Sequence, residues 1–268
     1  MKTPHDLRQE DDALRAQGVI DLRAIGRWLR FGAADLRRSP GPGLTHGVIF
    51  TFVGWLLLWV AGDQFWWLVG AYSGFLIVAP LAVTGLYEVS RQGREGHRIS
   101  LFEIGLLWLS FDRRLVQFGC LLGLAGLGWV LSSAALVTGW APEPVARPLD
   151  FLHVVVLAPE GYLFELWLLM GGVLAAPMFA SSVIAMPMLI GTRAGVWQSV
   201  TASWRVCAAH PMAMASWAAT LMVFVGLGML TGLFGLIVVT PWLAHASWHA
   251  YEDAQAWLDG ENSPPKDA

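Results

Sequence analysis

Long stretches without a single charged residue constrain this chain more than any other feature of its sequence. The stretches from Leu44 to Ala61, from Phe65 to Tyr87 and from Leu115 to Thr138 contain no Asp, Glu, Lys or Arg. An α-helix needs about 20 mostly apolar residues to cross the hydrocarbon core of a bilayer. Only 14% of the 268 residues are charged, whereas a soluble domain carries about 25%. The sequence therefore indicates an integral membrane protein and excludes an ordinary soluble fold.

Six apolar segments are long enough to be spanning helices, so we expect an all-α, polytopic membrane domain over residues 20–254. The apolar stretch from Met212 to Ala250 is too long for one helix, and the glycines near its middle predict a turn that divides it in two. The expected spans are about residues 44–61, 65–87, 115–138, 162–190, 212–230 and 234–252. We expect a polar, flexible N-terminus (1–19) and a polar cytoplasmic tail (255–268) on either side of this domain.

The basic residues predict how the chain is oriented. Of the 17 lysines and arginines, all except Arg147 lie before span one, between spans two and three, between spans four and five, or after span six. The positive-inside rule makes that side cytoplasmic, which places both termini in the cytoplasm and the chain in a bacterial inner membrane. No cleavable signal peptide is visible, so we expect span one to act as its own insertion signal. The apolar run Phe151–Leu157 of the outer loop is too short to span, and we expect it to lie in the interface or to fold back.

The chain also reads as three repeated hairpins, each preceded by an amphipathic cytoplasmic helix. We expect these leader helices at Ile20–Arg38, Leu101–Arg114 and Val196–Ala209. The second helix of each hairpin carries a proline in an apolar run, at Pro80, Pro187 and Pro241, and Pro177 predicts a tilt or kink in span four. All three hairpins run in the same direction, which predicts a parallel repeat about an axis along the membrane normal. Such a repeat either frames a substrate site or reflects duplication of a stable hairpin.

Histidines near the cytoplasmic ends of the spans are the only candidates for a metal or haem site. His245 and His249 are spaced i, i+4 and share one helix face, and His46 lies at a similar depth in span one. Three imidazoles at one level could bind a metal, and two could ligate a haem. The alternative is that they are interfacial histidines bonded to Trp248, Tyr251 or headgroups. No carboxylate within the spans at that depth would orient them as ligands, so we expect no cofactor.

Arginines and glycines suggest contacts with lipid and between helices. The first leader helix carries Arg23, Arg27, Arg30, Arg37 and Arg38. These residues either bind anionic phospholipid headgroups or only anchor the topology. Three GxxxG patterns predict close helix packing and, more weakly, a homo-oligomer. Their glycines are Gly70 and Gly74, Gly119 and Gly123, and Gly228 and Gly232.

Groups for known chemistries are scarce. The spans hold no charged residue at mid-membrane, which argues against ion-coupled transport through buried acids. The sequence contains no P-loop, HExxH motif or nucleophile elbow and no nucleic-acid signature, so we predict no catalytic residues.

Several short motifs together resemble a family of bacterial integral membrane proteins that is known only as a domain of unknown function. They are Trp28–Gly32, Asp35–Pro42, Gly85–Glu88, Ala158–Gly161, Met186–Leu189 and His245–Tyr251. The resemblance extends from about Ile25 to Tyr251. The chain departs from the family pattern at His210-Pro211, where Asn-Pro is expected, and at Gly191-Thr192-Arg193, where an Asp-Arg pair is common. Some members carry a cytochrome c oxidase subunit I label, but six spans and three membrane-level histidines do not suit that chemistry.

These observations favour a non-enzymatic function. We expect a membrane-embedded accessory or assembly component that acts through helix packing and through lipid or protein contacts. One alternative is a channel or permease for a small neutral solute, with the repeat forming its pathway. A second alternative is a haem- or metal-binding protein associated with respiration, which would use His46, His245 and His249.

Overall fold

The computed structural model describes residues 13–14, 18–97, 99–109, 112–158 and 161–261. All regular elements in these ranges are helices, as expected, and no strand occurs among them. The helices are α2 (Leu22–Arg38), α3 (Pro40–Ala61), α4 (Phe65–Ala82), α5 (Thr84–Arg94), α6 (Leu101–Leu109), α7 (Arg113–Trp140), α8 (Pro148–Phe151), the π-helix η1 (Leu152–Val156), α9 (Leu163–Ser182), α10 (Ala185–Gly191), α11 (Val196–Ala209), α12 (Pro211–Leu230) and α13 (Leu236–Glu261). Most of the predicted N-terminal segment 1–19 and the end of the tail lie outside the described residues.

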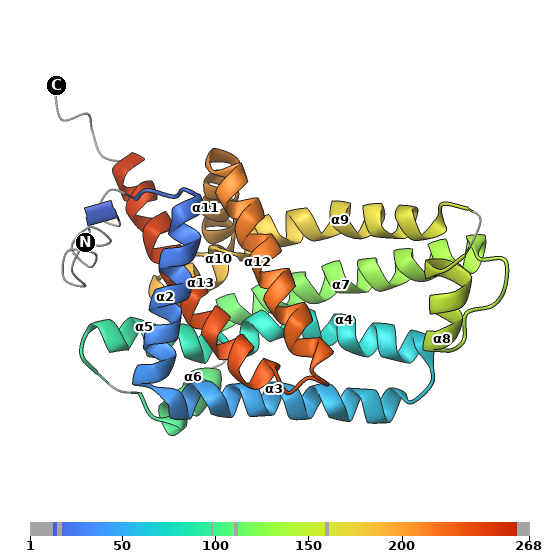
Figure 1. Cartoon of the computed structure of the whole chain (residues 1–268). Coiled ribbons are helices and arrows are strands. Elements are labelled where there is room, and N and C mark those ends of the chain that lie inside the picture. Colours follow the sequence, from blue (N-terminus) through green and yellow to red (C-terminus); the bar gives the residue numbers. More distant parts are fainter. Residues whose placement is uncertain (1–12, 15–17, 98, 110–111, 159–160, 262–268) are drawn as a thin grey trace, which may run out of the picture.

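The helices form a long stem and a head at one end of it (Figure 1). The stem consists of α3, α4, α7 and α9, which run side by side. The head consists of α2, α5, α10, α11, α12 and α13. Four segments meet the length and hydropathy required of a membrane span among the described residues: Pro40–Ala61, Arg113–Trp140, Leu163–Gly191 and Pro211–Leu230. The chain is therefore an all-helical membrane protein with several apolar helices.

Two of the predicted spans are interrupted. Span two divides at Val83 into α4 and α5, and span four divides at Val183 and Ile184 into α9 and α10. Proline has no N–H, so Pro187 cannot donate to the carbonyl of Val183, four residues earlier. At the same break, the buried backbone N–H of Ile184 donates to Ser203 Oγ at 3.2 Å. The helix is thus interrupted at Val183 and Ile184, four and three residues before Pro187, whereas Pro177 lies inside α9 without interrupting it.

The third hairpin, α12–α13, is arranged differently from the first. Its turn binds the middle of α3, where Thr51 Oγ1 donates to Leu233 O at 3.1 Å and Trp55 Nε1 donates to Gly232 O at 2.8 Å. Trp55 lies six residues before the end of α3, which corresponds to about 9 Å along the helix. The turn therefore stops short of the end of the stem that lies far from the head. This geometry does not confirm six equivalent spans or a threefold hairpin repeat.

Pro241 and Gly47 explain how α13 approaches α3 so closely. Pro241 lies inside α13 and cannot donate to the carbonyl of Ile237, four residues earlier. Gly47 of α3 backs directly onto that carbonyl, and a Cβ at position 47 would clash with it. A small residue at such a crossing lets two backbones approach each other, and a Cα–H can lie against the released oxygen.

The first leader helix is part of the head. Asp21 caps α2 by accepting from the N–H of Ala24 at 2.9 Å. Trp28 is fully buried and packs edge-to-face on Trp217 of α12, with ring centroids 5.4 Å apart. Gly32 lies against the backbone of Ala246 in α13. The other leaders form α6 and α11, and α6 ends at Leu109 rather than at Arg114.

The end of α13 and the end of the stem far from the head are both more structured than the sequence predicted. Residues 255–261 continue α13, and Leu258 is buried against the head, so the predicted tail 255–268 begins too early. At the end of the stem far from the head, α8 and η1 fold back over α4, α7 and α9. Phe151 stacks on Phe65 at 4.8 Å between ring centroids, and Val155 is buried. The outer apolar run therefore covers the end of the stem.

Candidate functional site: a buried polar network and apolar clefts

A network of polar side chains lies inside the head, where α2, α5 and α13 meet. His249 of α13 is at its centre and is only 3% exposed. Its Nε2 lies 2.9 Å from Asp35 Oδ2 of α2, and its Nδ1 lies 2.9 Å from Glu252 Oε2. Ionised carboxylates only accept hydrogen bonds, so both ring nitrogens must carry a proton to satisfy both contacts. His249 is thus placed to bridge two carboxylates as an imidazolium.

Ser90 of α5 extends the network to the second histidine. Its hydroxyl donates to Asp35 Oδ2 at 2.8 Å and lies 2.7 Å from His245 Nδ1. Since a hydroxyl has one proton, the bond with His245 requires the imidazole to donate from Nδ1. The Nε2 atom of His245 is buried and has no hydrogen-bond partner in the described part of the chain. His245 is therefore oriented as a neutral imidazole whose Nε2 bears a lone pair.

Asp35, the acid that contacts both His249 and Ser90, is held in its ionised form. Burial alone would raise the pKa of Asp35, but hydrogen bonds from His249 and Ser90 outweigh it and hold the pKa below its ordinary value. Glu252 accepts from Trp248 Nε1 and pairs with Arg94 Nε, each at 3.0 Å. The network thus ends at the surface, where the Arg94 side chain is about half exposed.

A second buried ion pair joins the start of α2 to the end of α13. Arg27 Nη2 lies 3.1 Å from Asp253 Oδ2 and donates to Val19 O at 2.8 Å. Trp28 Nε1 donates to the same oxygen of Asp253 at 2.8 Å. Arg27 is 2% exposed and Asp253 is fully buried. The prediction that Arg27 faces lipid headgroups is therefore wrong, because its charge is used inside the head, whereas Arg23, Arg30, Arg37 and Arg38 are exposed.

Of the three predicted histidines, His245 and His249 lie in α13 of the head and His46 lies near the start of α3, and they do not form a shared ligand set. His46 Nδ1 lies 2.7 Å from Pro42 O, so this imidazole is held by its own helix. His249 has a carboxylate on each ring nitrogen and keeps no lone pair for a metal. In the described part of the chain, no group of three or more His, Cys, Asp or Glu residues is placed to hold a metal ion.

Asp35 is the functional residue that sequence reasoning missed. We expected no carboxylate within the spans at the depth of the histidines, and Asp35 reaches His249 from outside the spans, from the leader helix, 214 positions away in sequence. The only hint was its inclusion in the motif Asp35–Pro42.

The predicted GxxxG glycines have different surroundings. An added Cβ at Gly70, Gly74 or Gly123 would meet no described atom within 4 Å, so these glycines face open space in the described chain. A Cβ on Gly228 would lie 2.9 Å from Leu236 Cδ2, which marks a close contact beside the turn. Gly232 has a φ of +66° and serves the turn itself. Gly119 is half-buried in α7.

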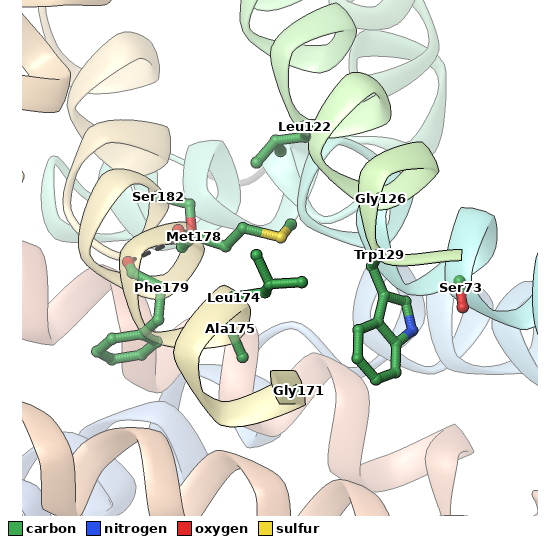
Figure 2. Close-up of a pocket in the computed structure, with 10 residues that line it drawn as sticks. All are labelled: Ser73, Leu122, Gly126, Trp129, Gly171, Leu174, Ala175, Met178, Phe179 and Ser182. Carbon is green, nitrogen blue, oxygen red and sulfur yellow. Dashed lines mark hydrogen bonds between the residues drawn. The ribbon is translucent and has the colours of Figure 1, made fainter. Parts of the chain in front are cut away.

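Apolar clefts lie between the helices. The largest described, about 370 Å³, lies between α4, α7 and α9. Figure 2 shows Leu174 and Met178 of α9 on one side of it, opposite Leu122 and Trp129 of α7. Besides the indole of Trp129, the side chains with polar groups in its described wall are those of Ser73 and Ser182. Ser182 Oγ donates to the carbonyl of Met178. Such a cavity does not favour ordered water, which needs several polar partners.

Two further clefts are also apolar. A groove of about 280 Å³ is lined by residues of α7, α9 and α11. A cleft of about 310 Å³ separates the first hairpin from the third, and its only side chains with polar groups are Tyr87, Thr240 and Ser247. The hydroxyl of Ser247 donates to Leu243 O and so is already satisfied within α13.

The polar network, called the polar lock below, joins helices of the head to one another through the side chains of Asp35, Ser90, His245, His249 and Glu252. Ser90 is 1% exposed, and its hydroxyl contacts both an acid and a histidine, which leaves no open side from which it could attack a substrate. Apart from His245 Nε2, the side-chain groups of Asp35, Ser90, His245, His249 and Glu252 bind one another and join α2 and α5 to α13. Buried polar networks that are well satisfied give a fold rigidity.

This fold and this site define a polytopic integral membrane protein with a polar lock at one end and apolar clefts along its stem. Residues 68–191 match a family model described as predicted integral membrane protein (DUF2189). The match confirms the resemblance to a family of uncharacterised integral membrane proteins, but not the cytochrome oxidase label. No curated protein and no solved structure matches the chain.

Proposed function

We propose that the protein is a non-catalytic accessory or assembly component of the cytoplasmic (inner) membrane. In this proposal the head and both termini face the cytoplasm, and α8 and η1 face outward. The distribution of cations supports this orientation, because exposed Arg23, Arg30, Arg37 and Arg38 belong to the head, whereas Arg147 caps α8 at the opposite end.

We retain six membrane-inserted segments as part of the proposal. The apolar parts of α4 and α13 would join the four segments that meet the requirements of a span. The third hairpin would then be strongly tilted, since its turn binds α3 at Thr51 and Trp55.

One observation carries the functional proposal: the buried polar groups of the head are used between helices, while the stem exposes many large apolar side chains. Asp35, Ser90, His249 and Asp253 all join one helix of the head to another. The stem exposes many large apolar side chains, such as Phe52, which is 63% exposed. A rigid head on an apolar stem suits a component that acts by contact with lipid or with another membrane protein.

A permease for a small neutral solute has less support. Such a pathway needs polar side chains to replace water around the solute, because a polar group in hydrocarbon without a partner costs several kcal/mol. The cleft between the first and third hairpins, where a repeat would frame the pathway, has a mostly apolar wall.

Native co-purification tests the proposal. The tagged protein is extracted from its source membrane in a mild detergent, and bound proteins and lipids are identified by mass spectrometry. We expect a membrane-protein partner in constant ratio to the chain. A chain that reproducibly purifies alone would overturn the accessory role.

Two pairs of variants can locate the partner surface on the stem. Phe52→Ala with Trp59→Ala alters an exposed face of α3, and Leu124→Ala with Leu131→Ala alters an exposed face of α7. All four side chains are more than half exposed, so neither pair removes core packing. We expect one pair to lower the yield of the partner and the other to leave it unchanged.

Reporter fusions test the orientation. A reporter at Asp63, in the turn between α3 and α4, should give an external signal, and a reporter at the C-terminus should give a cytoplasmic one. A cytoplasmic signal at Asp63 would overturn the arrangement.

A further inference from the structure

The contacts of His249 with its two acids depend on a single proton. Its Nε2 lies 2.9 Å from Asp35 Oδ2 of α2, and its Nδ1 lies 2.9 Å from Glu252 Oε2 of α13. A neutral imidazole carries one N–H and one lone pair, so it can donate to only one of these oxygens. After loss of one proton, the lone pair would face a carboxylate at hydrogen-bond distance. One of the two contacts is therefore lost with that proton.

The other contacts of the two acids place this proton on the imidazole. The Ser90 hydroxyl donates to Asp35 Oδ2 at 2.8 Å. On the other side, Glu252 Oε1 accepts from Trp248 Nε1 and pairs with Arg94 Nε, each at 3.0 Å. These partners are all donors, which suits two carboxylates on either side of a doubly protonated ring.

The helices packed around His249 present few groups that change charge near neutral pH. Histidine is the side chain whose ordinary titration falls in this range. His245, one turn earlier in α13, donates to Ser90 and is thereby oriented as a neutral imidazole. His46 is the titratable residue of α3, and its ring is held by its own helix. No titratable residue occurs in α10 or α12, which also pack against α13.

The charged groups next to this cluster are already paired. Glu88 of α5 is bonded to Arg91, and Arg27 of α2 is bonded to Asp253. At the far end of α13, Glu261 pairs with Arg205 of α11. A change of charge at His249 is therefore felt first by the two acids that contact it.

The two acids keep different partners when His249 is neutral. Glu252 retains two donors, Trp248 Nε1 and the guanidinium of Arg94, which is about half exposed at the surface of the head. Asp35 retains the Ser90 hydroxyl. The neutral ring is thus best used with its proton on Nε2, donated to Asp35, while its Nδ1 lone pair faces Glu252. Repulsion between this lone pair and the carboxylate turns Glu252 towards Arg94.

We propose that His249 makes the polar lock proton-dependent: doubly protonated, it joins Asp35 of α2 to the Glu252–Arg94 pair of α13 and α5, and loss of one proton releases Glu252. This regulation goes beyond the proposed accessory function and does not depend on it. The contact with Glu252 stabilises the head while the imidazolium keeps both protons. That stabilisation is lost as the pH rises through the pKa of the imidazolium.

The unfolding midpoint of the full-length protein in detergent, measured from about pH 6 to about pH 9, tests the proposal. We expect the midpoint of the wild type to fall as the pH rises. A hydrogen bond between charged groups and the size of this chain correspond to a fall of about 3–12 °C. A midpoint that stays level or rises over this range would overturn the proposal.

Glu252→Gln is the most informative variant, because an amide can both accept and donate. Its oxygen can keep the contacts with Trp248 and Arg94, while its NH₂ group donates to the lone pair of a neutral Nδ1. The contact with His249 then no longer needs the second proton, so we expect the fall in midpoint to be reduced to less than half. Glu261→Gln removes a carboxylate from the same helix in an exposed pair and should keep the wild-type pH dependence. Equal pH dependence in the wild type and Glu252→Gln, or equal flattening in both variants, would reject the role of Glu252.

Imidazole nitrogen NMR of protein labelled at histidine reports the proton directly. The signals of His249 are identified by their absence in His249→Gln. We expect both nitrogens to be protonated at about pH 6 and Nε2 alone to be protonated at about pH 9. A ring that is already neutral at pH 6, or one that keeps both protons at pH 9, would overturn the proposal even if a variant proved too unstable to compare.

Discussion

The buried pair of Arg27 and Asp253 gives the sharpest test of how α2 is held to the head. The variant Asp253→Ala leaves the Arg27 charge inside the protein and removes the acceptor of Trp28 Nε1. Breaking a buried ion pair by removing one partner costs about 3–5 kcal/mol, because the remaining charge is uncompensated. For a chain of this size, 1 kcal/mol corresponds to about 2–4 °C in the unfolding midpoint. We therefore expect the midpoint to fall by about 6–20 °C.

The measurement is the fraction of monodisperse protein that remains after heating in detergent, followed by size-exclusion chromatography. Glu261→Ala is the matched control, since it breaks an Arg205–Glu261 pair whose side chains are 47% and 48% exposed. An exposed pair contributes about 0–1 kcal/mol, so the control should shift the midpoint by no more than about 4 °C. Equal shifts for the two variants would refute the argument from burial.

A double replacement distinguishes the buried charge from lost packing. Arg27→Met with Asp253→Leu removes both charges and keeps apolar volume in the site. Replacing a buried pair by apolar residues of similar size is often neutral, so the double variant should recover most of the loss caused by Asp253→Ala. A double variant as unstable as the single one would show that the uncompensated charge is not the cause.

Three further predictions follow from the same structure. Asp35→Asn should lower the stability of the folded protein at neutral pH and make that stability fall less steeply in acid. The pKa of Asp35 is held below its ordinary 3.8 in the folded protein, so the stabilisation from its carboxylate is complete above pH 3.8 and is lost as the pH falls through the lower folded-state pKa. Parallel acid denaturation curves for variant and wild type would contradict this. Gly47→Ala should destabilise the fold by about 1–3 kcal/mol, because the new Cβ would meet the carbonyl of Ile237. The control Gly26→Ala, where the Cβ enters open space, should be neutral or stabilise the fold by up to about 1 kcal/mol. Equal thermal midpoints for the two variants would refute the close approach of α3 and α13. Burial raises the pKa of the Cys207 thiol to about 11, so alkylation at pH 8, followed by peptide mass spectrometry, should be much slower in the folded than in the denatured protein.

The membrane environment and most helices could be read from the sequence, because both depend on local properties. Continuous apolar stretches predicted α3, α7 and α12 close to their actual bounds, whereas the stretch predicted as span four divides into α9 and α10. A helix boundary set by a nearby cap or proline is also local, and Val196–Ala209 was predicted at its observed limits. The division at Val183 depends on Pro187 within the same segment, but an apolar pattern alone does not show which of two prolines interrupts a helix.

The polar lock could not be read from the sequence, because its partners come from opposite ends of the chain. Arg27 and Asp253 are 226 positions apart, and Asp35 and His249 are 214 apart. On its own, α2 has the pattern of a helix lying in the headgroup layer. Only the close packing of Gly32 on Ala246 and of Trp28 on Trp217 turns its inner face towards α13 and buries Arg27. The sequence by itself determined which helices are apolar enough to lie in a membrane, because hydropathy is a property of single residues. Tertiary structure decided which charges are buried and paired, because that depends on which helices meet.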